Sequence, residues 1–102
     1  SKFKGENMQA VNELKSIFNS YINITNKFNK DDSFSKLLDE SSAKLDELEN
    51  KMNELKSIAK NDEEMFKVFD FMQIMTQLMY GNVDEKERDK LLSKAAKISN
   101  SL

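Results

Sequence analysis

The chain has 102 residues, of which 16 are basic and 18 acidic, so its formal net charge is −2. This balance gives no electrostatic argument for binding nucleic acid, and Arg88 is the only arginine. The sequence contains neither Cys nor His, which excludes disulfides, thiolate or histidine metal sites, and nucleophile pairs that depend on histidine. Pro is absent and Gly occurs twice, which favours one all-α domain over residues 1–102.

The first predicted helix spans residues 6–30. Apolar side chains recur along it every three or four positions, which is typical of an amphipathic helix with one broad apolar face. The polar segment 29–33 then predicts a break, at which Asp32 or Ser33 caps the next helix. The apolar positions of the first helix are Met8, Val11, Leu14, Phe18, Tyr21 and Phe28, with Ile17, Ile22 and Ile24 widening the stripe.

The second predicted helix spans residues 33–60 and has a narrow apolar stripe in a heptad pattern. Two arrangements fit such a stripe, the outer helix of a bundle or one strand of a two-stranded coiled coil. We favour the bundle because the helix that follows needs to be covered. The heptad positions are Leu38, Ser41, Leu45, Leu48, Met52, Leu55 and Ala59.

The third predicted helix, residues 62–80, contains the most apolar stretch of the chain, MFKVFDFMQIMTQLMY at 65–80. Asn61 with Glu64 three residues later predicts a capping box at its start. No Gly or Pro enforces this break, so one continuous helix over 33–80 stays an alternative, although the heptad loses its apolar register after Ala59. Polar residues form one stripe that should face water, Lys67, Asp70, Gln73, Thr76 and Gln77.

The fourth predicted helix spans residues 84–100. Gly81 predicts a left-handed stop for the preceding helix, and Asp84 with Glu87 three residues later predicts the new start. The four segments together predict an all-α, antiparallel up-down four-helix bundle with 65–80 as its most buried helix. The predicted core comprises Val11, Leu14, Phe18, Tyr21, Leu38, Leu45, Leu48, Leu55, Phe66, Phe69, Met72, Met75, Leu78, Leu91, Ala95 and Ile98.

Acidic side chains are the remaining candidates for catalysis, and they occur in pairs at helix starts or on polar faces. A carboxylate needs burial to act as a general base, and only Asp70 has mostly apolar neighbours. Because Asp70 shares the polar stripe with Lys67, we interpret it as a solvated surface acid. We therefore expect no catalytic residue, no cofactor and no metal site.

A protein-binding role is the functional reading of the methionine and aromatic cluster at 65–80. Methionine side chains are flexible and polarisable, and surfaces rich in them bind varied partners, although methionine at helical spacing also fills cores. The same face can fill the core and also bind a partner if the bundle leaves part of it exposed. The candidate partner-binding residues are Phe66, Asp70, Met72, Met75 and Met79.

The chain resembles the four-helix bacteriocin immunity proteins of Gram-positive bacteria, of the enterocin-A-immunity type. The resemblance covers about residues 10–98 and lies in DDSFSKLLDESSAKLDELENKMNEL at 31–55, and in QLMYGNVDEKERDKLL at 77–92 with its paired leucines. The lack of a run of 18 apolar residues separately predicts no membrane-spanning segment, and we expect a monomer or homodimer. The resemblance itself implies a cytoplasmic, non-enzymatic bacterial protein. Such a protein protects its producer by engaging a bacteriocin-occupied membrane receptor.

A second resemblance is to the small helical-hairpin partners of type VII secretion substrates. The segment 66–70, FKVFD, fits the F-x-x-x-D pattern of some of them, whereas their usual W-x-G turn is missing. This resemblance implies a helical adaptor of a secreted protein. A coiled-coil oligomerisation module through 33–60 is the third alternative.

Overall fold

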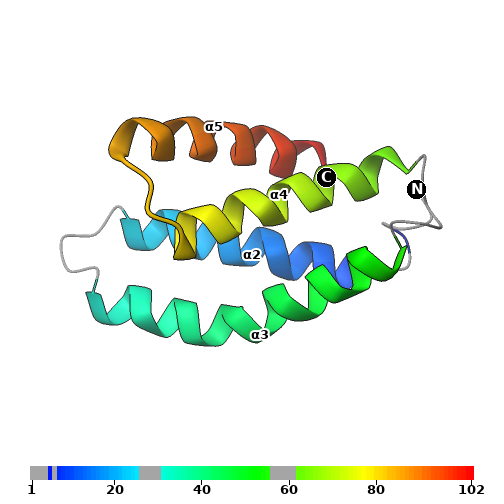
Figure 1. Cartoon of the computed structure of the whole chain (residues 1–102), viewed down its shortest axis with the longest axis horizontal. Coiled ribbons are helices and arrows are strands. Elements are labelled where there is room, and N and C mark those ends of the chain that lie inside the picture. Colours follow the sequence, from blue (N-terminus) through cyan, green and yellow to red (C-terminus); the bar gives the residue numbers. More distant parts are fainter. Residues whose placement is uncertain (1–4, 6, 26–30, 56–61) are drawn as a thin grey trace.

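A computed structural model describes residues 5, 7–25, 31–55 and 62–102 of the chain. Within these ranges it contains four α-helices and no strand. Successive helices run in opposite directions along the long axis of the molecule (Figure 1), which confirms the predicted all-α, antiparallel up-down bundle. The helices are α2 (Met8–Thr25), α3 (Asp31–Leu55), α4 (Glu63–Tyr80) and α5 (Glu85–Ser101).

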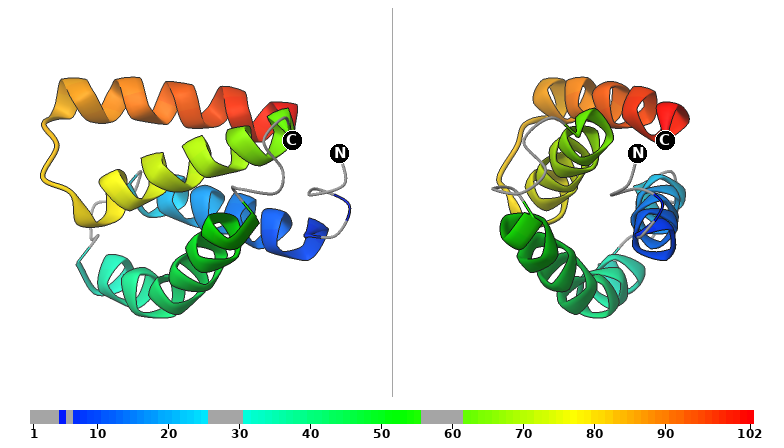
Figure 2. Two further views of the ribbon diagram at one scale, coloured as in Figure 1. Left: turned by 45° about the vertical axis from the view of Figure 1, so that its right-hand side comes forward. Right: turned by 90° about the vertical axis from the view of Figure 1, so that its right-hand side faces the viewer.

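Helix α4 contacts each of the other described helices. It packs against α2, α3 and α5, and the end-on view in Figure 2 shows it between α5 on one side and α3 on the other. This arrangement follows from composition, because α4 is apolar around most of its circumference and needs several neighbours to exclude water. Eight residues of α4 are buried, more than in any other described helix, so the prediction that 65–80 is the most buried helix is confirmed for the described residues.

The start of α4 differs by one residue from the prediction. Asp62, rather than Asn61, is the N-cap, and its Oδ1 atom accepts a hydrogen bond from the backbone N–H of Met65 at 3.1 Å. Asp62 has an extended backbone (φ −84°, ψ 97°), which ends the alternative of one continuous helix over 33–80. An aspartate at this position accepts a hydrogen bond from a free backbone N–H and places negative charge at the positive end of the helix dipole.

The other predicted helix starts have different outcomes. Asp84 caps α5 as expected, with its Oδ1 atom accepting from the backbone N–H of Glu87 at 2.8 Å. Helix α3 already includes Asp31, so Asp32 and Ser33 lie inside the helix and neither is its N-cap. The predicted helical residues 26–30 and 56–60 lie outside the described part of the chain.

Gly81 ends α4, but not through the left-handed conformation that the sequence predicts. Its backbone is extended (φ −82°, ψ 167°), and its N–H donates to the carbonyl oxygen of Gln77 at 2.9 Å. A Cβ atom added to Gly81 would lie 2.6 Å from that same oxygen. Glycine is needed here because the backbone turns tightly against the last helical turn, not because of a positive φ.

The core forms around α4, and most of its predicted members are buried. The prediction is wrong for Phe66, which is 41% exposed, whereas the unpredicted Val68 and Phe71 are both 0% exposed. The ring of Phe71 packs edge-on against Phe18 of α2, with centroids 5.3 Å apart and planes at 84°. Leu38, Phe69 and Ile98 are partly buried against the core, and the side chains of Leu48 and Leu55 lie outside the described ones.

The helices around α4 bury narrower stripes. In α3, the buried residues Leu37, Ser41 and Leu45 follow each other at four-residue spacing, so part of the predicted heptad faces the bundle rather than a second chain. In α5, Leu91, Ala95 and Ser99 have the same spacing. The small Ala95 and Ser99 side chains allow α5 to approach α4 closely.

Candidate partner-binding face of helix α4

One side of α4 is not covered by the other helices, and we call this side the α4 face. Its polar residues are all exposed, as the sequence predicts, and they follow one stripe along the helix. The same side carries two exposed aromatic side chains, Phe66 and Tyr80, which are 41% and 49% exposed. The polar residues of the face are Lys67, Asp70, Gln73, Thr76 and Gln77.

The two aromatic side chains point to the same side for a geometric reason. Phe66 and Tyr80 are 14 residues apart, which is close to four turns of an α-helix, or about 21 Å along its axis. Phe69 lies between them and is partly buried against the core. Aromatic residues are enriched in protein interfaces relative to the rest of the surface, so these two side chains make the α4 face a candidate for binding a protein.

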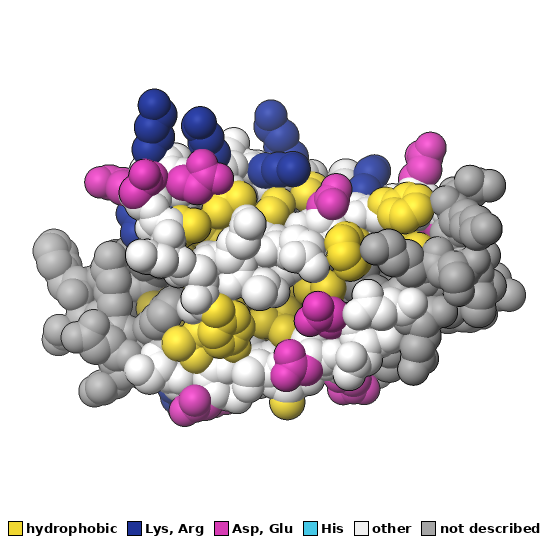
Figure 3. Space-filling model, in the orientation of Figure 1, with side chains coloured by type: hydrophobic (Ala, Val, Ile, Leu, Met, Phe, Trp, Pro, Cys, Tyr) yellow, Lys and Arg dark blue, Asp and Glu magenta, His cyan; other side chains and the backbone are white. Residues whose placement is uncertain are grey.

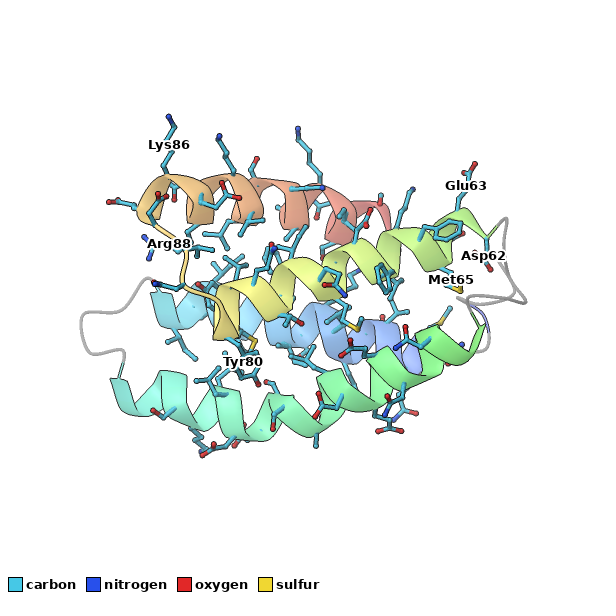
Figure 4. All side chains as sticks on the ribbon, viewed as in Figure 1. Asp62, Glu63, Met65, Tyr80, Lys86 and Arg88 are labelled. Carbon is cyan, nitrogen blue, oxygen red and sulfur yellow. The ribbon has the colours of Figure 1, made fainter. Side chains whose placement is uncertain are left out.

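Tyr80 joins the α4 face to α3. Its hydroxyl donates to the carbonyl oxygen of Leu38 at 3.3 Å, and its side chain leans toward α3 in Figure 4. Burial is the main cause that raises the pKa of Tyr80, and the negative charges of Asp46 and Asp39 raise it further, while a hydrogen bond with Ser42 opposes them. These effects place acidic side chains of α3 beside the tyrosine at this end of the face.

The five predicted partner-binding residues separate into two groups. Met72, Met75 and Met79 are at most 5% exposed, so the other helices of the bundle cover them. Phe66 and Asp70 are exposed on the α4 face, four residues apart, and therefore lie on the same side of the helix. In this conformation a partner can reach Phe66 and Asp70 but not the three methionines.

Tyr80 is a residue of this face that sequence reasoning missed. Its spacing from Phe66 is visible in the sequence, but the periodicity alone treats both as members of an apolar helix. Their exposure depends on where α3 and α5 lie around α4, which is a property of the tertiary structure.

Charged residues are unevenly distributed at the two edges of the face. Figure 3 shows Lys and Arg side chains along the edge formed by α5, with acidic side chains beside them at the beginning of that helix, and acidic side chains over α3 at the opposite edge. Helix α5 carries five basic and three acidic residues, whereas α3 carries three basic and eight acidic ones. The α4 face therefore lies between a basic and an acidic edge.

A buried tyrosine lies on the inner side of the bundle, near the first turn of α5. Tyr21 of α2 is 4% exposed, and burial raises the pKa of its hydroxyl. The positive charge of Arg88 in α5 acts in the opposite direction and more weakly. Arg88 of α5 is therefore close enough to Tyr21 of α2 for its charge to act on the tyrosine hydroxyl.

The described ranges contain neither a metal-binding cluster nor a membrane-spanning helix. No three His, Cys, Asp or Glu side chains among these residues are grouped so that they could hold a metal ion. Across the same ranges, no helix combines the length and apolar character needed to cross a lipid bilayer.

Comparisons with known proteins do not assign the chain to a family. No model of a known protein family matches it, and neither a curated protein nor a solved structure matches it.

Proposed function

We propose that this chain is a small, non-enzymatic helical binding protein that engages a protein partner through the α4 face. The observation that carries the proposal is the exposure of Phe66 and Tyr80 on a helix whose other large apolar side chains are buried or partly buried. Aromatic residues are enriched where proteins bind each other, because they bury a large area at a small entropic cost.

The more specific proposal is an immunity protein of the bacteriocin type, acting in the cytoplasm on a bacteriocin-occupied membrane receptor. An antiparallel four-helix bundle of about a hundred residues supports this proposal, and so does the pattern at 31–55 and 77–92 that resembles such proteins. The α4 face would supply the contact with the receptor complex.

Expression of the chain in bacteriocin-sensitive bacteria tests this proposal. We expect survival against at least one related bacteriocin, and loss of survival for Phe66→Ser, because the substitution removes an exposed aromatic anchor. Met8→Ser is the matched control, since Met8 is 52% exposed but lies on α2, outside the α4 face. Unchanged killing by every related bacteriocin in cells that contain the folded protein would refute the immunity proposal.

A second candidate function is that of a helical partner of a type VII secretion substrate. The specific observation in its favour is that Phe66 and Asp70, the two fixed positions of the F-x-x-x-D pattern, are both exposed on one side of α4. Asp70→Asn should leave the free energy of unfolding within about 0.5 kcal/mol of the wild type, as expected for a surface acid. If a co-expressed substrate is no longer secreted with the folded Asp70→Asn variant, the second candidate is favoured. Unchanged secretion would count against it.

A further inference from the structure

The α4 face has the charge pattern of a surface that can pair with a copy of itself. Its α5 edge carries an excess of basic residues and its α3 edge an excess of acidic residues. Figures 1 and 3 place these helices at opposite edges of the face, with α4 between them. A face with one edge of each sign is complementary to a second copy that is turned so that its edges are exchanged.

A row of lysines forms the basic edge. Lys90, Lys94 and Lys97 follow one another after four and three residues, so they lie along one side of α5, and all three are exposed. Lys86 lies four residues before this row, and Figure 4 shows its side chain pointing away from the bundle. The three acidic residues of α5 all lie in its first five positions, so the row is free of acids from residue 90 onward.

The acidic edge lies on the side of α3 that adjoins α4. The Tyr80 hydroxyl donates to the carbonyl oxygen of Leu38, which fixes the side of α3 that adjoins α4. Asp46 follows Ser42, a hydrogen-bond partner of Tyr80, by about one helical turn and therefore lies on this side, and both Asp46 and Asp39 raise the pKa of Tyr80. Glu49 follows Asp46 by three residues, so it continues the row, and all three acids are exposed. The row spans about 15 Å along α3, compared with about 10 Å for Lys90 to Lys97 along α5.

We propose that the α4 face is the interface of a two-fold symmetric dimer of this chain. A two-fold axis parallel to the helices places the lysine row of each copy against the acidic row of the other. The same rotation brings the two α4 helices across each other, so that Phe66 and Tyr80 of both copies lose contact with water. Because each copy uses the same surface, the dimer leaves no free α4 face to which a third copy could bind.

The dimensions of the face suit such a contact. The molecule measures 43 by 25 Å in the plane of Figure 1, which is the plane of the α4 face. A standard interface takes about 800 Å² from each partner, and a surface of this size can supply it. Because charged pairs at the edges are screened by salt, the dimer is weaker at high ionic strength. The dimer and the proposed receptor complex would use the same α4 face, so dimerisation would compete with the proposed binding of a partner.

Analytical ultracentrifugation of the full chain, from micromolar to millimolar concentration, tests the proposal. The measurement compares the wild type with two variants in which the charge of one row is reversed. One variant reverses the lysine row (Lys94→Glu with Lys97→Glu), and the other reverses the acidic row (Asp46→Lys with Glu49→Lys). We expect the wild type to dimerise and each variant alone to dimerise at least about tenfold more weakly. Mixing the two variants should restore a dimer, because both edges then face an opposite charge.

A third variant controls for the change in net charge. Glu40→Lys with Glu47→Lys alters charge as much as the acidic-row variant, but these residues flank Lys44, which pairs with Glu13 of α2 at 4.0 Å. They therefore lie on the α2 side of α3, and this variant should dimerise more like the wild type than like the acidic-row variant. Circular dichroism melts establish that all variants are folded.

Three results would overturn the proposal. The first is a wild-type protein that stays monomeric at every concentration measured. A monomer that instead binds anionic lipid vesicles through its lysine row would count in the same way. The second is a mixture of the two row variants that does not associate. The third is a mass that rises beyond the dimer, which would mean an open head-to-tail contact of α5 on α3. A monomer that still protects cells would overturn the dimer and leave the proposed function intact.

Discussion

Replacing Phe71 by Ala tests the packing of α4 most directly, because its ring is 0% exposed and packs against Phe18. Truncation of a buried phenylalanine typically costs about 3–5 kcal/mol, through lost transfer energy and the cavity that remains. A domain of this size has a total stability of about 5–15 kcal/mol. We therefore expect Phe71→Ala to remove a large share of the free energy of unfolding.

Phe66→Ala is the matched comparison, since it makes the same chemical change on the same helix. Phe66 is 41% exposed, so its truncation should cost less than about 1 kcal/mol. Urea unfolding followed by circular dichroism measures both variants. At about 4–8 °C for each kcal/mol, the two variants should also differ clearly in Tm.

The edge-to-face contact between Phe18 and Phe71 should contribute an interaction energy of its own to the stability. Phe18→Leu, Phe71→Leu and the double variant form a cycle that isolates the interaction between the two rings. We expect a coupling of about 0.5–1.5 kcal/mol. Equal costs for Phe66→Ala and Phe71→Ala, or a larger cost for Phe66→Ala, would contradict the prediction, because α4 would then have to be rotated so that Phe66 faces the core.

Three further predictions concern the ends of α4 and α5 and the buried tyrosine. Gly81→Ala should destabilise the protein by about 1–3 kcal/mol in urea unfolding, because its Cβ would meet the Gln77 carbonyl oxygen; an unchanged midpoint would count against the tight turn. Asp84→Ala should cost about 0.5–2 kcal/mol and Asp84→Ser much less, since serine also accepts the Glu87 N–H; equal losses would show that capping is not the cause. Because burial raises the pKa of Tyr21 in the folded state, its contribution is fully present below pH about 10 and is lost as the pH rises above that value. Urea midpoints across this range should fall less steeply for Tyr21→Phe, and an unchanged slope would contradict the assignment.

Local signals in the sequence predict the helices well, because each depends on residues close in the chain. The start of α5 at Asp84 needs only an acceptor placed before free backbone N–H groups, and this can be read from four residues. The start of α4 is shifted by one residue because Asn61 and Asp62 are both good caps and only the backbone geometry selects Asp62. Gly81 shows the same limit, since sequence indicates a stop but not the conformation that makes it.

The candidate site was predicted only in part, because exposure on an apolar helix is not a local property. Phe66 and Asp70 were identified and are accessible, whereas the three methionines chosen with them are buried. Phe66 and Phe71 have the same side chain and lie five residues apart, which is about 140° around the helix. One faces water and the other the centre of the bundle.

Sequence patterns alone predict that the chain is helical, where helices α4 and α5 begin and end to within a residue or two, and that 65–80 is the most buried of the described helices. These outcomes follow from hydrophobic periodicity, capping residues and the absence of proline, all of which act over short distances along the chain. The tertiary structure decided which aromatic side chains of α4 stay exposed and that the face they form lies between a basic and an acidic edge. The physical reason is that burial depends on how three helices are placed around α4, and that placement depends on contacts between residues far apart in the sequence.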